Sequence, residues 1–78
     1  MKQYAAVVLE ITKDGDFNTI HFGEMKTKKD AVKMAQRRSL VEGLIMGVDC
    51  YQETEMTTYN PIYLEVYCNG KKITRINY

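Results

Sequence analysis

The sequence has few of the residues that catalytic and metal sites most often use. Its 78 residues include one histidine, two cysteines and no tryptophan. Cys50 and Cys68 are too few for a disulfide scaffold and lack the spacing of metal ligands, so we expect reduced thiols, one or both of them buried. Nothing in the pattern places either thiol beside His21, so we expect this histidine to be a half-exposed strand residue.

Motifs that would indicate catalysis are missing as well. The chain has no phosphate loop, nucleophile elbow or zinc ligand set. Asp14 and Asp16 could contact a metal, but the calcium-loop pattern does not continue after them, and the intervening Gly15 favours a hairpin turn. We therefore expect a binding protein that is not an enzyme and that uses no metal or cofactor.

Long apolar runs are absent too. No stretch approaches the ~20 residues that cross a bilayer. The apolar stretch after Lys2 is interrupted by Glu10, and no small-residue cleavage site follows, so we expect a strand and not a signal peptide, in a cytoplasmic protein. A chain of this length forms one domain, residues 1–78, which buries about 60% of its unfolded surface.

Basic residues are missing from Ser39 to Gly70, and this is the most informative absence. That stretch holds five acids, whereas residues 26–38 carry six basic residues against the single acid Asp30, and the last eight residues carry three more. The formal net charge of +1 therefore hides a polarised molecule. A concentrated basic patch attracts polyanions even when the whole protein is nearly neutral.

The pattern of β-forming residues predicts strands over residues 2–12, 17–23, 62–68 and 71–78. The first of these is largely apolar on both faces, which predicts a central place in the sheet. The pairs Asp14-Gly15 and Asn69-Gly70 favour tight hairpin turns. Residues 48–56 are a candidate strand, and residues 57–61 are expected to form a loop because the proline at 61 disfavours helix before it.

A helix is predicted between the two halves of the sheet. Thr27 is placed to cap it by accepting a hydrogen bond from the backbone N–H of Asp30. We expect the helix to run from about Lys28 to about Met46, weakened at Gly43 and ended by Gly47. At roughly 100° per residue, one side is apolar. That side carries Ala31, Met34, Ala35, Val41 and Ile45. The opposite side carries a predicted basic stripe of Lys26, Lys29, Lys33 and Arg37.

The element order β-β-α-(β)-β-β predicts an α+β fold. We expect an antiparallel sheet of four or five strands, with the helix packed on one face and the other face partly open.

The predicted basic stripe is a candidate nucleic-acid site. It spans about 16 Å, which can follow a run of phosphates, and it lacks the glutamates at i,i+4 that a merely solvated helix tends to carry. An ordinary solvated helix face is the alternative. We expect Lys29, Lys33 and Arg37 to bind phosphate. Auxiliary contacts are expected from Lys26, Arg38, Lys71, Lys72 and Arg75, with Arg38 at the edge of the apolar face.

Tyrosine is the main aromatic residue, with six copies against two phenylalanines. Tyr63 and Tyr67 share one face of the predicted strand 62–68, which we expect to point outward. They are candidates to stack on unpaired bases. A protein-binding face and simple cross-strand packing are the alternatives.

Two further surfaces are candidates for protein contacts. The acidic stretch could dock on a basic host protein as a mimic of nucleic acid, through Glu53, Glu55 or Glu65. Leu40 and Leu44, on the outward face of the predicted helix, are candidates for a homodimer contact.

The hairpin around Asp14-Gly15, the helix beginning at Thr27 and the hairpin at Asn69-Gly70 together resemble a group of small phage-encoded inhibitors of bacterial defence. This group includes anti-CRISPR proteins and phage proteins that block toxin–antitoxin systems. The resemblance covers most of the chain and is one of architecture and composition. It implies a non-enzymatic inhibitor that acts by steric or electrostatic occlusion.

These features favour a small RNA-binding inhibitor that interferes with a host ribonuclease toxin or defence complex through its basic helix. RNA is preferred to DNA because a short helix without helix-turn-helix partners lacks the usual delivery into the major groove. The alternative is a protein-only inhibitor, such as an anti-CRISPR protein, that docks through the acidic or tyrosine-rich surface.

Overall fold

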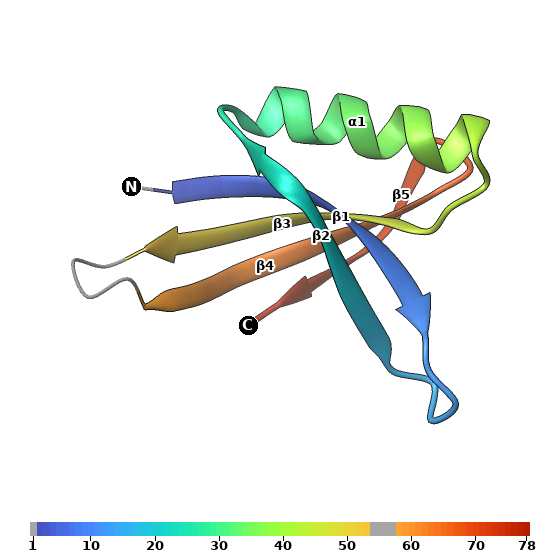
Figure 1. The fold of residues 1–78 in the computed structure, drawn as a ribbon, viewed down its shortest axis with the longest axis horizontal. Coiled ribbons are helices and arrows are strands. Elements are labelled where there is room, and N and C mark those ends of the chain that lie inside the picture. Colours follow the sequence, from blue (N-terminus) through green and yellow to red (C-terminus); the bar gives the residue numbers. More distant parts are fainter. Residues whose placement is uncertain (1, 54–57) are drawn as a thin grey trace.

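Within the part of the chain that the structure describes, five strands form one antiparallel sheet, and a single helix packs across one of its faces (Figure 1). The computed structural model describes residues 2–53 and 58–78. The elements follow the chain as β1 (Lys2–Ile11), β2 (Phe17–Met25), α1 (Lys28–Val41), β3 (Met46–Glu53), β4 (Tyr59–Cys68) and β5 (Lys71–Asn77). The predicted α+β fold with one helix is confirmed, and the candidate third strand exists. The part of its predicted range beyond Glu53 lies outside the described residues.

The strand order is β2-β1-β3-β4-β5, so β1 lies inside the sheet and β2 and β5 form its edges. The predicted central place of β1 is therefore confirmed. Ala5, Ala6 and Val7 of β1 are almost completely buried. The apolar character of both β1 faces is explained by a sheet that is covered on both sides at this point.

Both predicted hairpin turns are present. Gly15 adopts a φ of +84°, and the backbone N–H of Thr12 donates to the carbonyl of Asp16 at 2.7 Å. Asn69 and Gly70 have φ values of +52° and +81°. Positive φ at both central residues is the geometry that an Asn-Gly pair provides at low cost in a two-residue hairpin.

The helix begins as predicted but ends earlier. The Thr27 hydroxyl accepts a hydrogen bond from the Asp30 N–H at 3.2 Å. Gly43 adopts a φ of +68° just after the helix, so it is Gly43 and not Gly47 that ends α1. Gly47 lies in β3, where an added Cβ would approach a Leu64 methyl carbon at 2.8 Å and a Val7 methyl carbon at 2.9 Å.

The predicted loop at 57–61 is also partly wrong. Tyr59, Asn60 and Pro61 belong to β4, where Pro61 lies opposite Tyr51 beside an irregularity in the register with β3. A proline lacks the N–H that a regular ladder uses, and such an irregularity accommodates it.

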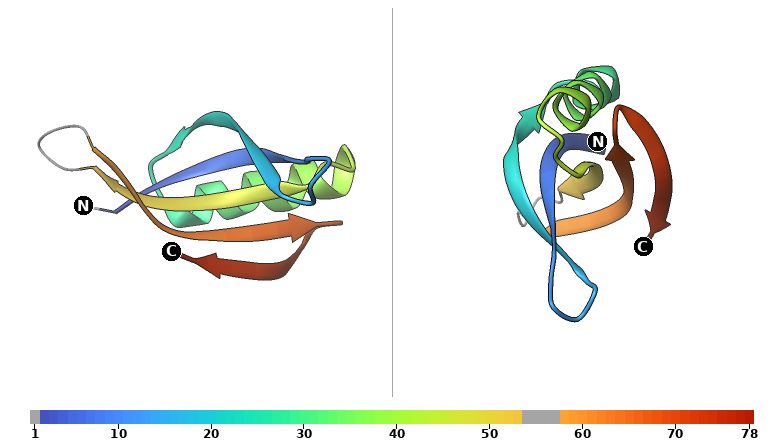
Figure 2. Two further views of the ribbon diagram at one scale, coloured as in Figure 1. Left: turned by 90° about the horizontal axis from the view of Figure 1, so that it is seen from below. Right: turned by 90° about the vertical axis from the view of Figure 1, so that its right-hand side faces the viewer.

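Apolar residues are buried on both faces of the sheet. The helix-side cluster consists of Ala6, Ala31, Ala35, Met46, Val48 and Tyr67. The opposite cluster consists of Ala5, Val7, Leu9, Tyr51, Leu64 and Val66, with Ile45 packed against it. The second face was predicted to be partly open, but these six residues are at most 4% exposed. The sheet is strongly twisted (Figure 2), and neighbouring strands of this face pack their side chains against one another.

A buried serine connects α1 to the β4–β5 turn. The Ser39 hydroxyl donates to the carbonyl of Gln36 at 3.1 Å and accepts from the backbone N–H of Gly70 at 2.9 Å. Both hydrogen-bonding roles of a side chain that is fully buried are therefore satisfied.

Candidate functional site

Three basic side chains form a stripe along the outer side of α1. This helix stripe consists of Lys29, Lys33 and Arg37, all exposed, on the side opposite the buried Ala31 and Ala35. Its ends are eight residues apart, about 12 Å along the axis at 1.5 Å per residue. Among the residues that the structure describes, no acid lies within ion-pair distance of these three.

Lys26 was predicted to belong to the same stripe, and this is wrong. It lies between β2 and α1, before the capping residue Thr27, so its side chain is not held in the helical row. The helical periodicity therefore begins at Lys28, two residues after Lys26.

Arg38 lies at the edge of the apolar face, as predicted, but it is paired. Its guanidinium donates to both carboxylate oxygens of Glu42, one turn further along, with the second contact at 3.2 Å. This hydrogen bonding raises the pKa of Arg38 and lowers that of Glu42. The expected absence of glutamates at i,i+4 therefore does not apply to Arg38, although it applies to the helix stripe.

A second group of cations surrounds a buried carboxylate. Glu65 is only 2% exposed, and the amine of Lys28 lies 3.5 Å from one of its oxygens. Lys72 and Arg75 lie 3.2 and 4.0 Å from the other oxygen. We call Lys28, Lys72 and Arg75 the cation cluster. Each of the three side chains is about half exposed, so the cluster faces solvent on its outer side.

The fold explains how distant parts of the sequence meet at Glu65. Arg75 is the cross-strand partner of Glu65 in the β4–β5 pair, and Lys28 comes from the first turn of α1 above them. The Arg75 guanidinium also lies 3.8 Å from the centre of the Tyr63 ring, and the Lys28 amine lies 5.3 Å from it. Cation–π attraction therefore helps to hold both side chains in place.

The predicted outward orientation of Tyr63 and Tyr67 is wrong. They are 5% and 4% exposed, on the face that α1 covers, and burial raises the pKa of both hydroxyls. Their rings are therefore not accessible to stack on bases. The strand alternation was correct, but the helix packs on the face that carries the tyrosines and Glu65.

Lys28 was not singled out from the sequence, although a signal for it was present. It lies three residues before Ala31 and seven before Ala35, so it shares the buried side of the helix. A lysine on that side needs an acid to accompany it, and Glu65 is the acid that the fold provides. Lys71, by contrast, is exposed at the start of β5 opposite Cys68.

The residues proposed for protein contacts are placed differently from the prediction. Glu65 is buried and ion-paired, Glu53 is exposed, and Glu55 lies outside the described residues. Leu40 is 65% exposed at the end of α1. Leu44 follows the helix and packs against the helix-side cluster, so the predicted outward pair of leucines does not form.

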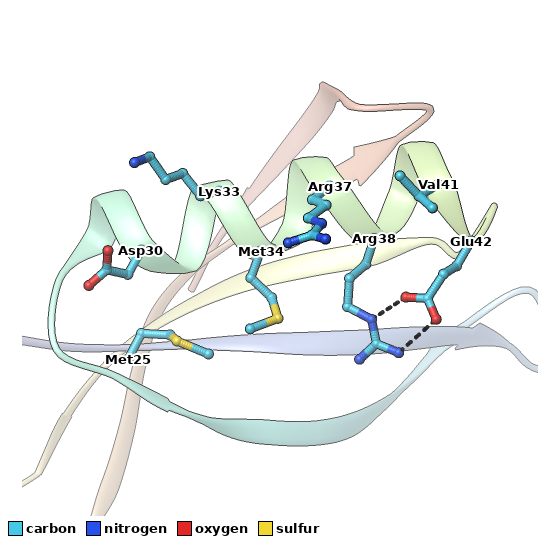
Figure 3. Close-up of a pocket in the computed structure, with 8 residues that line it drawn as sticks. All are labelled: Met25, Asp30, Lys33, Met34, Arg37, Arg38, Val41 and Glu42. Carbon is cyan, nitrogen blue, oxygen red and sulfur yellow. Dashed lines mark hydrogen bonds and ion pairs between the residues drawn. The ribbon is translucent and has the colours of Figure 1, made fainter.

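A groove of about 990 Å³ lies between α1 and the end of β2 (Figure 3). Met34 and Arg38 project from α1 toward β2, and Met25 lies across from them. Two thioethers and a guanidinium therefore line its inner side.

Charged side chains border the same groove. Lys33 and Arg37 belong both to its lining and to the helix stripe, so the groove opens directly beside that row of cations. Asp30 lies at the N-terminal end of the groove and Glu42 at the other end, where Glu42 binds Arg38 (Figure 3).

The opposite face of the sheet carries a second buried acid. Asp49 is 9% exposed and accepts a hydrogen bond from the Tyr59 hydroxyl. Burial raises the pKa of Asp49, against the smaller lowering effects of the Tyr59 hydrogen bond and of His21. Desolvation and a hydrogen bond to Glu24 raise the pKa of nearby Tyr51 to about 12.

Cys50 and Cys68 are free thiols, and Cys50 is buried as expected for a small apolar residue. Within the described part of the chain, no group of three or more His, Cys, Asp or Glu side chains is arranged to hold a metal ion. No helix there is both long and apolar enough to cross a membrane.

Comparison with known protein families, curated proteins and solved structures found no match for this chain.

Proposed function

We propose that this protein is a non-enzymatic RNA-binding protein whose binding surface combines the helix stripe and the cation cluster. One observation carries the proposal: two basic segments that are separated by more than thirty residues without a single lysine or arginine lie beside each other in the fold. Lys28 of the cation cluster and Lys29 of the helix stripe are consecutive residues in the first turn of α1, so the two groups approach each other at this end of the helix, although their side chains leave it about 100° apart.

The charges on this surface support a polyanionic ligand. The three cations of the helix stripe have no ion-paired acid among the described residues, and the cation cluster has three cations for one buried carboxylate. Phosphates would therefore neutralise an excess of positive charge, and binding would release counterions.

RNA is a better candidate than duplex DNA for structural reasons. Because α1 lies flat on the sheet, only its outer side is exposed, and no second helix is available among the described residues to carry it into a major groove. Single-stranded or looped RNA can instead follow a row of cations on a surface.

In the biological role that we propose, this surface occludes RNA from a host ribonuclease toxin or defence complex in the cytoplasm. The support for that role is the resemblance in architecture to small phage-encoded inhibitors.

The binding surface is tested by charge reversal. The double variant Lys33→Glu/Arg37→Glu is expected to weaken binding of a labelled single-stranded RNA at least ~100-fold at low salt, because two phosphate contacts become repulsive. Fluorescence anisotropy over a salt series measures both the affinity and its salt dependence.

A matched control compares the single variants Lys33→Glu and Lys13→Glu, which make the same change in net charge; Lys13 is exposed in the turn between β1 and β2. Equal losses in both single variants would show that only net charge matters. Unchanged RNA affinity in the Lys33/Arg37 variant would contradict the proposed function.

A further inference from the structure

We propose that the groove between α1 and β2 binds an unpaired nucleobase of the RNA whose phosphates follow the helix stripe. This inference rests on the proposed function and names the part of the ligand that the groove accepts. It also replaces the predicted stacking on Tyr63 and Tyr67, which are buried.

The inner side of the groove suits a flat aromatic ring. Met25 and Met34 are partly buried against the helix-side cluster, so their positions are supported from below. Thioether sulfurs make favourable contacts with aromatic rings, and methionine adapts to irregular shapes. A volume of about 990 Å³ is at the upper end of the usual range for small-ligand sites, so a nucleoside fits with space to spare.

Arg38 adds a planar partner for the base. Its guanidinium is held by both carboxylate oxygens of Glu42 and projects into the groove beside Met34 (Figure 3). Guanidinium planes stack on unpaired bases in RNA complexes, and a guanidinium that is already oriented loses less freedom on binding.

The charge beside the groove favours a nucleotide over an apolar protein side chain. Lys33 and Arg37 border the groove and have no ion-paired acid in the described ranges 2–53 and 58–78. A nucleobase in the groove has phosphates attached on both sides of its sugar. One ligand could therefore contact the apolar lining with its base and the cations with its phosphates. Paired bases in a duplex remain stacked and cannot enter, so the ligand must be single-stranded.

The first experiment compares two ligands on the unaltered protein. Fluorescence anisotropy would measure the affinity of a ten-nucleotide oligoadenylate and of an abasic oligoribonucleotide with the same number of phosphates. We expect the oligoadenylate to bind about tenfold more tightly, in line with one or two ring contacts.

A matched pair of variants locates that difference. Met34→Gln keeps the length of the side chain but removes its apolar contact, and is expected to remove most of the preference for oligoadenylate over the abasic ligand, as measured by the ratio of the two affinities. Met34→Leu keeps an apolar lining and is expected to retain most of the tenfold preference.

A second measurement does not depend on any variant. In methyl NMR spectra of the unaltered protein with ¹³C-labelled methionine methyl groups, oligoadenylate is expected to shift the signals of Met25 and Met34 through ring currents, and the buried Met46 serves as an unaffected control. The abasic oligonucleotide is expected to leave all of them in place.

The outcomes separate this inference from the proposed function. Equal binding of both oligonucleotides would overturn the base site while leaving phosphate binding intact. Failure of both to bind would overturn the proposed function as well. Methyl shifts produced by an acidic peptide containing phenylalanine, with none produced by RNA, would assign the groove to a protein partner and overturn the base site.

Discussion

Two acidic residues are buried on opposite faces of the same sheet, and their surroundings differ sharply. Glu65, under the helix, has three cations within 4.0 Å. Asp49, on the other face, is bound by the hydroxyl of Tyr59, and its pKa is raised by burial. The same type of group thus holds three cations together in one place, whereas in the other its burial without an ion-paired cation in the described ranges makes the ionised form costly.

This contrast explains why the cation cluster is at once structural and exposed. Glu65 holds the inner side of Lys28, Lys72 and Arg75, whereas their outer sides remain in solvent. The helix stripe has no such anchor among the described residues, so its side chains are available to a ligand but contribute little to the fold.

Removing the carboxylate of Glu65 should have the largest effect. Glu65→Ala leaves three cations close together without a counter-charge, and we expect a loss of about 2–3 kcal/mol in the free energy of unfolding. The value is below that for a fully buried ion pair because the cations can turn into solvent. Urea denaturation at low salt measures it, with the exposed Glu53→Ala as the control.

A change smaller than about 0.5 kcal/mol in Glu65→Ala would show that Glu65 does not anchor the cluster. RNA binding gives an independent readout, since removing a negative charge from the surface should strengthen it while the fold weakens.

Removing the charge of Asp49 should instead increase the free energy of unfolding. Since the pKa of Asp49 is raised in the folded protein, its protonated form is favoured, and its contribution to stability is lost as pH rises above the ordinary range of aspartate. Asp49→Asn stays neutral at every pH and can still accept from the Tyr59 hydroxyl. We expect it to stabilise the protein by about 1 kcal/mol at pH 7 and to make little difference near pH 3.

Urea denaturation across this pH range measures the Asp49 effect, and Glu10→Gln, at an exposed position of β1, is the control. If Asp49→Asn is instead less stable than the unaltered protein at pH 7, the ionised carboxylate of Asp49 stabilises the fold, and the proposed difference from Glu65 is wrong.

The smallest changes in stability should distinguish the cation cluster from the helix stripe. Arg75→Ala removes an ion pair and the contact with the Tyr63 ring, so we expect a loss of about 1 kcal/mol in the free energy of unfolding. Lys33→Ala is expected to change it by less than about 0.5 kcal/mol, yet to reduce the salt dependence of RNA binding by about 0.7 in the logarithmic slope. Equal stability changes in the two variants would remove the distinction between the groups.

Much of the fold could be predicted from local signals. The Thr27 cap and the turns at Asp14-Gly15 and Asn69-Gly70 depend on residues close together in the sequence, and each is present. The end of α1 was less predictable, because the apolar residues after Gly43 continue the helical pattern although the chain has already left the helix.

The site was harder to predict because it depends on which face the helix covers. Along β4, Leu64 and Val66 suggest a core on one side, and the tyrosines provide one on the other. Both faces of β4 are in fact buried, so the alternation of its residues could not show which face of the sheet the helix covers. The helix stripe was found from its periodicity, but the meeting of Lys28 with Glu65 needed the tertiary structure.

The hydroxyl of Ser39 has a consequence for the way in which the protein opens. It bonds to both α1 and the turn of the β4–β5 hairpin. If the helix and the hairpin separate, the buried hydroxyl and the N–H of Gly70 lose their hydrogen bond. The helix and the hairpin should therefore exchange their amide hydrogens as one cooperative unit, and a chain that transiently releases either of them loses the whole basic surface together.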